Sequence, residues 1–434
     1  MRGDTIAAIA TAPGRAGVAV VRVSGPDALA VAERLTGGDA GCLRKGGGRR
    51  REAPYVLRSS FFDRGSLVDD GLVLVFKAPH SYTGEDVVEF QGHGGAIAPR
   101  RVLESALAAG ARLAERGEFT ARALLNGKLD YAGARSVIDL IDAKTERAAD
   151  AALAGLSGAA TAAMRAIYRA ALELSATVEH ALDIDEGELP DGFVAGLKTK
   201  DGELKAALDE EIRKAKSGKI LRDGALVVLA GAPNAGKSSL LNALVGEDRA
   251  IVSDVPGTTR DPIEEWLDFG GWPVRLVDTA GVREGGAGAD AVEAEGIRRA
   301  KDLIARADLV LYLQPASSDL PPPAAAVGLT SKCDLGRGPG LNVSAKTGEG
   351  LEELRGRIAA ELERRAAGLS EREADDARLA ALLEARRLMG EFTDDLVLFG
   401  NAVRAAATRL GGALGATYSA DLLDRLFSRF CVGK

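Results

Sequence analysis

The residues best suited to chemistry lie at 231–238, where GAPNAGKS fits the pattern G-x4-G-K-[ST]. Glycine in such a loop lets backbone N–H groups turn toward phosphates, and the start of the following helix adds positive potential. Lys237 would reach the β- and γ-phosphates of a nucleotide, and Ser238 would ligate Mg²⁺. A strand-like apolar run precedes the loop and a helix-like run follows it, so the pattern predicts a phosphate-binding site between the two.

Two short motifs further along the chain would complete the contacts to Mg²⁺ and the γ-phosphate. In TTRD (258–261), a candidate first switch, Thr259 would be the second Mg²⁺ ligand. The motif DTAG (278–281) follows an apolar strand pattern. Asp278 would hold the water shell of Mg²⁺, and the N–H of Gly281 would meet the γ-phosphate. Each motif alone is weak evidence, but their order and spacing together indicate a P-loop nucleotide-binding domain.

Two later loops occupy the positions of guanine-reading loops, namely SKCD (331–334) and SAK (344–346). Asp334 would accept hydrogen bonds from N1–H and N2–H₂ of guanine, a pair of donors that adenine cannot supply. We therefore predict a preference for GTP over ATP. The usual motif is Asn-Lys-x-Asp, and here Ser331 replaces the Asn. Because serine is shorter and loses a hydrogen bond, we predict GTP specificity with weakened affinity.

The motifs leave open which residue would position the attacking water. Ras-like enzymes use a Gln directly after DxxG, whereas this chain has the apolar Val282. Arg283, Glu284 and Glu293 lie in the predicted second switch, and the carboxylate of Glu293 could polarise a water molecule. The alternative is that Glu293 is an ordinary solvated helix residue, and the residues alone favour that alternative.

The motifs lie in a region of alternating strand-like and helix-like segments, which is typical of a mostly parallel sheet. Helix-like Ala/Leu/Arg/Glu segments flank this region on both sides, and strand-like runs dominate the first part of the chain. The predicted fold class is multidomain α/β plus α, with a P-loop GTPase domain inserted into a helical domain. The predicted boundaries are 1–120 for an N-terminal α/β domain, 121–217 for the first part of the helical domain, 218–368 for the inserted domain and 369–434 for the second helical part.

Composition narrows the class of protein further. The 434 residues have a formal net charge of −7 and are 4% aromatic, which excludes a polycation that coats nucleic acid and argues against a base-stacking platform. The three cysteines give no disulfide framework and fit a reducing compartment. No apolar run approaches the roughly 18–20 residues of a membrane span. We therefore expect a cytoplasmic protein that is not embedded in a membrane.

The quoted motifs, together with segments in the rest of the chain, resemble the tRNA modification GTPase MnmE (TrmE) family. The segments that carry the resemblance are GAPNAGKSSLLNAL, AIVSDVPGTTRD, DTAGVRE and VEAEGIRRA in the middle, DTIAAIATAPGRAGVAVVRVSG, HSYTGEDVVEFQGHGG and RGEFTARALLNGKLDYAGARSVIDLIDAKT before it, and the closing FCVGK. They cover the chain nearly end to end, whereas a generic GTPase would match only the middle. The resemblance implies an N-terminal domain that binds folate and dimerises.

The resemblance also implies an activity and its partners. It implies a K⁺-dependent GTPase that works with the flavoprotein MnmG, which carries FAD, in a heterotetramer or larger complex. Together they would place an aminomethyl-type group on C5 of the wobble uridine, U34, of tRNA, with 5-formyl- or methylene-tetrahydrofolate as one-carbon donor. The alternatives are a GTP switch or assembly factor without modification chemistry, and a folate-dependent one-carbon transferase in which GTP is regulatory. The terminal Cys-x-Gly-Lys and the segments SYTGEDVVE and LNGKLD favour the first function.

Four charged residues are implied as folate contacts, namely Arg22, Glu85, Lys128 and Lys434. Arginine and lysine suit the glutamyl carboxylate of folate, and a carboxylate suits the N–H donors of the pterin ring. The thiol of Cys431 is implied to act in the tRNA modification, and the alternative is a structural free thiol.

Potassium is implied as the element that neutralises charge where other GTPases use an arginine finger. Its ligands would come from Asn234, Ser253, Val255 and Thr258, with Val255 contributing its backbone carbonyl. The implied catalytic residues are Glu293, Lys237 and Cys431. The implied nucleotide contacts are Asn234, Ala235, Gly236, Lys237, Ser238, Ser239, Ser253, Asp254, Val255, Pro256, Gly257, Thr258, Thr259, Asp278, Thr279, Ala280, Gly281, Lys332, Asp334, Ser344, Ala345 and Lys346.

Overall fold

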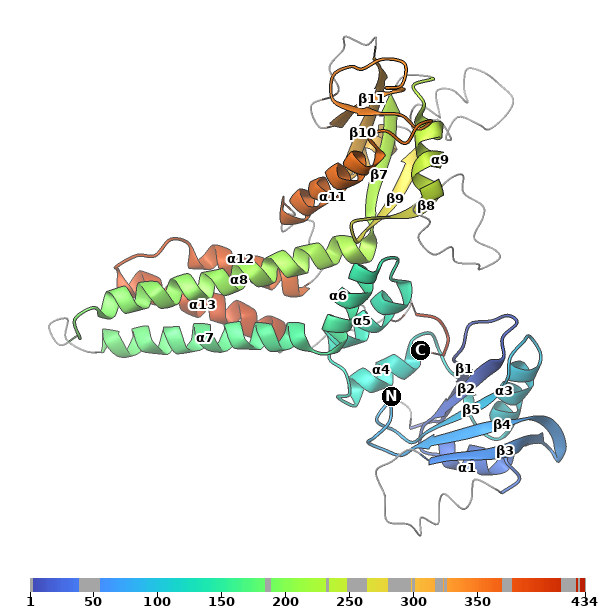
Figure 1. The fold of residues 1–434 in the computed structure, drawn as a ribbon. Helices are drawn as coiled ribbons and strands as arrows, with labels where there is room; N and C mark the ends of the chain where they lie inside the picture. The colour runs from blue at the N-terminus through green and yellow to red at the C-terminus, as the bar shows by residue number, and fades with distance from the viewer. Residues whose placement is uncertain are drawn as a thin grey trace. The chain divides into compact units, whose positions relative to one another are not determined.

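The chain divides into two compact units (Figure 1). One unit comprises Met1–Ile138, Leu156–Gly158 and Thr417–Lys434, and the other comprises Asp139–Gly155 and Ala159–Ala416. The structure is a computed structural model that describes residues 3–38, 55–183, 189–231, 234–247, 264–279, 298, 301–316, 323, 326–368, 377–414, 427 and 430–433. Both ends of the chain therefore belong to the first unit.

The first unit is built on a sheet that has six strands among the described residues, in the order β3-β4-β5-β2-β1-β6. Its strands are β1 (Ile6–Ile9), β2 (Val18–Ser24), β3 (Tyr55–Asp63), β4 (Ser66–Phe76), β5 (Val87–His93) and β6 (Arg112–Leu113). Neighbouring strands are antiparallel except β1 and β6, which are parallel. Alternate residues such as Val21, Val73 and Phe90 point to one face, where they form a core with α1 (Ala28–Leu35) and α3 (Ala98–Ala108).

The opposite face of this sheet is covered at β1 by residues from later in the chain. Ile6 and Ala8 of β1 pack against Ala114 and Phe119. Phe119 is fully buried and lies in helix α4 (Glu118–Leu125). This packing places the start of α4 beside the β1–β2 end of the sheet.

The last described residues of the chain also belong to the first unit. Phe430 is buried against helix α5 (Tyr131–Asp142). Gly433 has a φ of +104°, and a Cβ there would lie 2.2 Å from the carbonyl oxygen of Ile9. Only glycine fits this close approach to β1, so the tail is held against the N-terminal sheet.

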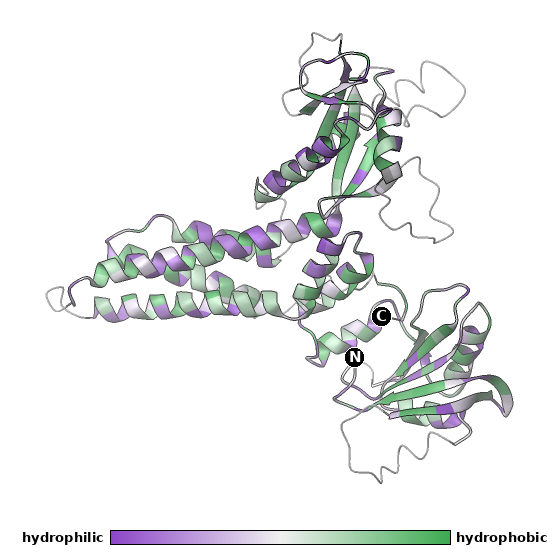
Figure 2. Ribbon diagram, viewed as in Figure 1, coloured by the Kyte–Doolittle hydropathy of each residue, from purple (hydrophilic) through white to green (hydrophobic). Residues whose placement is uncertain are grey.

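Helices of the second unit pack side by side in a bundle (Figure 1). These helices are α7 (Ala159–Leu182), α8 (Phe193–Asp223), α12 (Ala377–Met389) and α13 (Leu396–Leu414). Their shared core contains Leu174, Leu208, Leu382 and Val403, one from each helix. Figure 2 shows hydrophilic and hydrophobic residues mixed along α8, as expected of a helix that buries one face. None of the helices in the described part of the chain is both long and apolar enough to cross a membrane.

A second sheet lies between α8 and α12 in the sequence and has the order β12-β11-β10-β7-β9-β8. Its strands are β7 (Ala225–Gly231), β8 (Glu264–Phe269), β9 (Trp272–Asp278), β10 (Leu309–Pro315), β11 (Ala326–Ser331) and β12 (Leu341–Val343). All described pairs are parallel except the edge pair of β8 and β9. Helices α9 (Lys237–Glu247) and α11 (Leu351–Gly368) pack Leu240 and Leu354 into its core. The predicted fold class is confirmed, because a mostly parallel α/β sheet interrupts a helical domain.

Helix α6 (Glu146–Leu156) packs against the second sheet, a contact that the sequence does not predict. The predicted segment 121–217 assigns α6 to the helical domain, yet its Ala148 joins the core of the second sheet. Ile220 and Leu221 at the end of α8 join the same core. Helical spacing identifies the apolar face of a helix but not the surface that this face meets, and the predicted domain boundaries stay a prediction.

Candidate nucleotide-binding and folate-binding sites

The predicted phosphate loop joins the central strand β7 to helix α9. Gly231 ends β7 with a φ of +139°, and a Cβ there would lie 2.1 Å from the carbonyl oxygen of Leu313 on β10. Gly236, directly before α9, has a φ of +90°. Both positions favour glycine on backbone grounds. The loop therefore leads into the N-terminus of a helix, which is the arrangement that binds phosphate.

The two residues at the start of α9 face different partners. The Nζ of Lys237, whose side chain is buried, donates to the carbonyl oxygen of Gly231 over 3.1 Å. The Oγ of Ser238 donates to Oδ2 of Asp278 over 2.7 Å. Asp278 is the last residue of β9, the strand next to β7 in the sheet. The structure thus brings together the hydroxyl predicted to ligate Mg²⁺ and the carboxylate predicted to hold its water shell, and oxygen ligands are those that Mg²⁺ prefers.

The predicted guanine-reading loops meet at the ends of β11 and β12. Ser344 is fully buried, and its Oγ donates to Oδ1 of the exposed Asp334 over 2.7 Å. The Nζ of Lys332 donates to the carbonyl oxygen of Asn234 in the phosphate loop over 3.1 Å. This link between the base-reading loop and the phosphate loop was not predicted, because a motif names a lysine without naming its partner.

Ser331, which stands where the usual motif has Asn, bonds within the sheet. Its Oγ donates to the backbone carbonyl oxygen of Gln314 on β10 over 3.3 Å. Thr279, predicted as a nucleotide contact, likewise bonds within the sheet, where its Oγ1 donates to the carbonyl oxygen of Leu229 over 2.9 Å. Ala235 is buried in the domain core, whereas Ser239 is exposed.

Ala345 is partly buried and Lys346 is exposed in the loop after β12. Their roles as nucleotide contacts, like those of the other residues of the site, stay predictions. The remaining predicted positions lie outside the described residues, namely Ser253, Asp254, Val255, Pro256, Gly257, Thr258, Thr259, Ala280, Gly281, Glu293 and Lys434.

Three of the predicted folate contacts lie in or next to the loop 79–85 of the first unit. The Nε of Arg22 donates to Oε1 of Glu89 over 2.8 Å. The guanidinium carbon of Arg22 lies 5.4 Å from the ring centroid of Tyr82 and 5.6 Å from that of Phe119. These contacts fix the arginine of β2 next to the loop by charge and by cation–π attraction.

Glu85 is the last residue of this loop, and Lys128 bonds to its first residue. The side chain of Glu85 is 27% exposed. The Nζ of Lys128 donates to the carbonyl oxygen of Pro79 over 3.0 Å. A Cβ on Gly84 would lie 3.2 Å from Cγ of Lys128, so the lysine stem packs against the residue before Glu85. Arg22, Glu85 and Lys128 are therefore gathered around one loop, although they are far apart in the sequence.

Residues 5–128 match the family model described as GTP-binding protein TrmE N-terminus, and residues 132–431 match the model described as MnmE helical domain. The chain belongs to the MnmE family. The resemblance predicted from the sequence motifs is thereby confirmed.

Curated relatives of this MnmE-family chain match it along its whole length. The protein named tRNA modification GTPase MnmE from Symbiobacterium thermophilum is 44% identical over 478 residues, covering 100% of both chains. The protein of that name from Bordetella petrii is 42% identical, over 99% of this chain and 98% of its own. The one from Alkalilimnicola ehrlichii is 41% identical, over 100% of both chains. The two units described above are therefore both within the part that matches.

The cysteines described in the structure have different surroundings. Cys431 is exposed, and its carbonyl oxygen accepts a long contact of 3.5 Å from the N–H of Gly117 at the start of α4. Cys333, inside the predicted base-reading motif, is buried, and this burial raises the pKa of its thiol. The exposed thiol of Cys431 is thus accessible on the first unit, and its role in tRNA modification stays a prediction.

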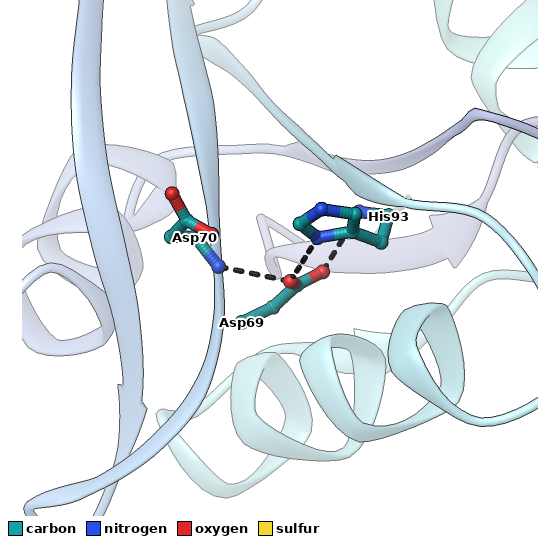
Figure 3. Close-up of side chains that lie close together, drawn as sticks. All are labelled: Asp69, Asp70 and His93. Carbon is teal, nitrogen blue, oxygen red and sulfur yellow. Dashed lines mark hydrogen bonds and ion pairs between the residues drawn. The ribbon is translucent and has the colours of Figure 1, made fainter.

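A cluster of Asp69, Asp70 and His93 lies outside the sites predicted from the sequence (Figure 3). Asp69 accepts from the ring Nδ1 of His93 over 2.7 Å and from the backbone N–H of His93 over 2.9 Å. Figure 3 shows Asp69 and His93 pointing toward each other, with a further hydrogen bond of 2.9 Å from the backbone N–H of Asp70 to Oδ1 of Asp69. The carboxylate of Asp70 pairs with Arg58 over 3.2 Å. The cluster is therefore a histidine–carboxylate pair with a neighbour, and its hydrogen bond and charge raise the pKa of His93.

Proposed function

We propose that this chain is a GTP hydrolase that acts in the modification of tRNA. The observation that supports this proposal best is the 44% identity to a tRNA modification GTPase MnmE over 100% of both chains. The contacts between Ser238 and Asp278 and between Ser344 and Asp334 support it independently, because they join motifs that are separate in the sequence. A similarity confined to the nucleotide domain would support a generic GTP switch equally well.

Different residues of the second unit are proposed to contact the phosphates, the metal ions and the base of GTP. The N-terminus of α9 and Lys237 bind the phosphates and favour the charge that develops on them. Ser238 would ligate Mg²⁺ together with Thr259, which lies outside the described residues, and Asp278 would hold the water shell of the ion, which supplies electrostatic neutralisation when it is bound. Asp334, oriented by Ser344, accepts hydrogen bonds from guanine, and Asn234 offers a side-chain oxygen toward K⁺. Water positioning is assigned to Glu293, which lies outside the described residues.

The first unit would supply the one-carbon group. Arg22 and Lys128 suit the glutamyl carboxylate of 5-formyl- or methylene-tetrahydrofolate, and Glu85 suits the pterin donors. We propose that a homodimer of this chain works in the cytoplasm with MnmG, the flavoprotein that holds FAD, on U34 of tRNA. Cys431 is proposed to take part in this modification through its exposed thiol.

Potassium dependence tests the proposed hydrolase. GTP turnover measured at equal ionic strength is expected to be at least tenfold faster in KCl than in NaCl, because K⁺ neutralises charge where no arginine is supplied. Purified MnmG is expected to raise the rate further. Equal rates in the two salts would contradict the K⁺ site. Normal U34 modification in a strain without this chain would contradict the tRNA function and favour a GTP switch or assembly factor.

A further inference from the structure

The carboxylate of Glu85 is held in one orientation by donors behind it. The Nη1 of Arg122 donates to Oε1 over 3.2 Å and to Oε2 over 3.1 Å. The Oγ of Ser24 donates to Oε2 over 2.8 Å. Since that hydroxyl proton is used on Glu85, the 2.7 Å contact between Ser24 and Thr83 must have the Thr83 hydroxyl as donor. Both oxygens of Glu85 thus have fixed partners, one of which comes from helix α4.

Arg122 is itself fixed by the rest of the network. Its side chain is 5% exposed. Nη1 also donates to the carbonyl oxygen of Asp4, and Nη2 donates to Oδ1 of Asp4 over 2.9 Å and to Oε1 of Glu118 over 3.0 Å. Burial works against the guanidinium charge, but the hydrogen bonds and charges of Glu118 and Glu85 outweigh it and raise the pKa of Arg122. The guanidinium therefore acts as a rigid fork with little freedom to turn.

The charges of this network do not cancel. Within the described residues it holds the carboxylates of Asp4, Glu85 and Glu118 and the guanidiniums of Arg112 and Arg122, which leaves one negative charge in excess. The side chains of Asp4 and Glu85 are 28% and 27% exposed, and that of Glu118 is 13% exposed. Among the described residues, Asp4 is paired with both guanidiniums and Glu85 with that of Arg122 alone, so Glu85 is the acid better placed to direct the surplus charge toward a ligand with N–H donors.

We infer that Arg122 is a positioning residue, which together with Ser24 holds Glu85 ready to accept the paired N–H donors of a pterin ring. This inference rests on the proposed function of Glu85 as a folate contact. Paired donors bond both oxygens only when the carboxylate lies in the plane of those donors, and a carboxylate fixed in advance loses little freedom when the ligand binds. The sequence motifs give no sign of this role, because Arg122 lies four residues into an ordinary helical pattern.

The test measures the dissociation constant of 5-formyl-tetrahydrofolate for the full-length protein by titration, with the thermal midpoint of each variant as the folding check. Arg122→Lys is expected to weaken binding about tenfold or more, because a single ammonium nitrogen cannot replace the two nitrogens with which the planar guanidinium reaches Glu85, Asp4 and Glu118. Ser24→Ala, which removes one donor and leaves Arg122 in place, is expected to weaken it about two- to tenfold. Arg112→Lys is the matched control, since Arg112 bonds Asp4 and Glu118 but has no described contact with Glu85. Its affinity is expected to stay within about twofold of the original.

A double-mutant cycle separates positioning from general damage. In a Glu85→Gln background, Arg122→Lys is expected to cause little additional loss of affinity, because its effect passes through Glu85. Equal weakening by Arg122→Lys and Arg112→Lys, or full additivity with Glu85→Gln, would overturn the inference. If Arg122→Lys does not fold, an unchanged affinity in Ser24→Ala would overturn it instead. If Glu85→Gln itself leaves folate affinity unchanged, the proposed folate contact is wrong, which is a separate result.

Discussion

The turn between β8 and β9 depends on a contact with helix α6 that one methyl group should break. Gly271 has a φ of +86°, and a Cβ there would lie 2.9 Å from both Cβ and Cδ of Arg147. Thr145 donates from Oγ1 to the carbonyl oxygen of Gly271 over 2.9 Å. The guanidinium carbon of Arg147 lies 4.2 Å from the ring centroid of Trp272. The substitution Gly271→Ala therefore strains the turn and displaces the arginine that covers it.

The size of the effect follows from these contacts. A positive φ costs an alanine about 1–2 kcal/mol. Loss of the cation–π contact and of the Thr145 hydrogen bond would add about 0.5–2 and about 0.5–1.5 kcal/mol. The ion pair of Arg147 with Glu363 is largely exposed and adds little. We expect Gly271→Ala to lower the free energy of unfolding of the nucleotide domain by about 2–5 kcal/mol.

The neighbouring glycine provides a matched control, and the tryptophans provide the assay. Gly270 has a φ of +61°, and among the described residues its added Cβ would meet Cβ of Ala359 at 3.3 Å and no atom of α6, so Gly270→Ala should cost about 1–2 kcal/mol of backbone strain. The chain has 2 tryptophans, Trp266 and Trp272, and both lie in this hairpin. Their fluorescence during urea unfolding therefore reports on the hairpin itself. Equal losses in the two glycine variants would refute the reasoning, because the contact with α6 would then contribute nothing.

Two further predictions concern the nucleotide site and the N-terminal sheet. Ser331→Asn should strengthen GTP binding about two- to tenfold in an equilibrium titration, because it restores a hydrogen bond of about 0.5–1.5 kcal/mol, and an unchanged or weaker affinity would count against our interpretation of Ser331. His93 should titrate above the usual 6.5 in NMR spectra, and Asp69→Asn should bring it back toward that value. The stabilisation that this raised pKa provides is present below pH 6.5 and is lost as the pH rises through the pKa of folded His93. A difference in unfolding free energy between the original protein and Asp69→Asn that grew with pH would contradict the pairing of His93 with Asp69.

The sequence predicts the centre of the nucleotide domain well, for physical reasons. The apolar run 225–231 is the strand β7 (Ala225–Gly231), which is almost fully buried, as a parallel strand covered on both faces must be. The loop after it needs glycine at fixed positions, so the spacing of these glycines in the sequence is enough to identify it. The pairing of Ser238 with Asp278 agrees with the order of the motifs, because Asp278 ends β9 and Ser238 lies at the start of α9, after the loop that follows the neighbouring strand β7.

Contacts between distant segments could not be predicted in the same way. In the sequence, Arg122 has the position of an ordinary charged residue on a helix surface. Its partner Asp4 is 118 residues away in the chain. Ala148 shows helical spacing, which says nothing about the sheet that it meets. The glycine at 433 is required by the carbonyl of Ile9, at the opposite end of the chain. Periodicity encodes which face of an element is apolar, but the partner of that face is decided by the assembly of the whole chain.

The contact of α6 with the hairpin matters for the site because of where the hairpin lies in the chain. It begins shortly after the predicted switch motif at 258–261 and ends at Asp278, the partner of Ser238. A displacement of Gly271 by a change in its contacts with Thr145 and Arg147 would therefore move the segment that links the two motifs predicted to surround Mg²⁺. Because β9 is also bonded along its length to β7, which leads into the phosphate loop, a shift of the turn cannot be absorbed by β9 alone. The segment at the start of α6 thus braces the hairpin that links these two motifs, because Thr145 donates to the carbonyl oxygen of Gly271 and Arg147 covers the ring of Trp272.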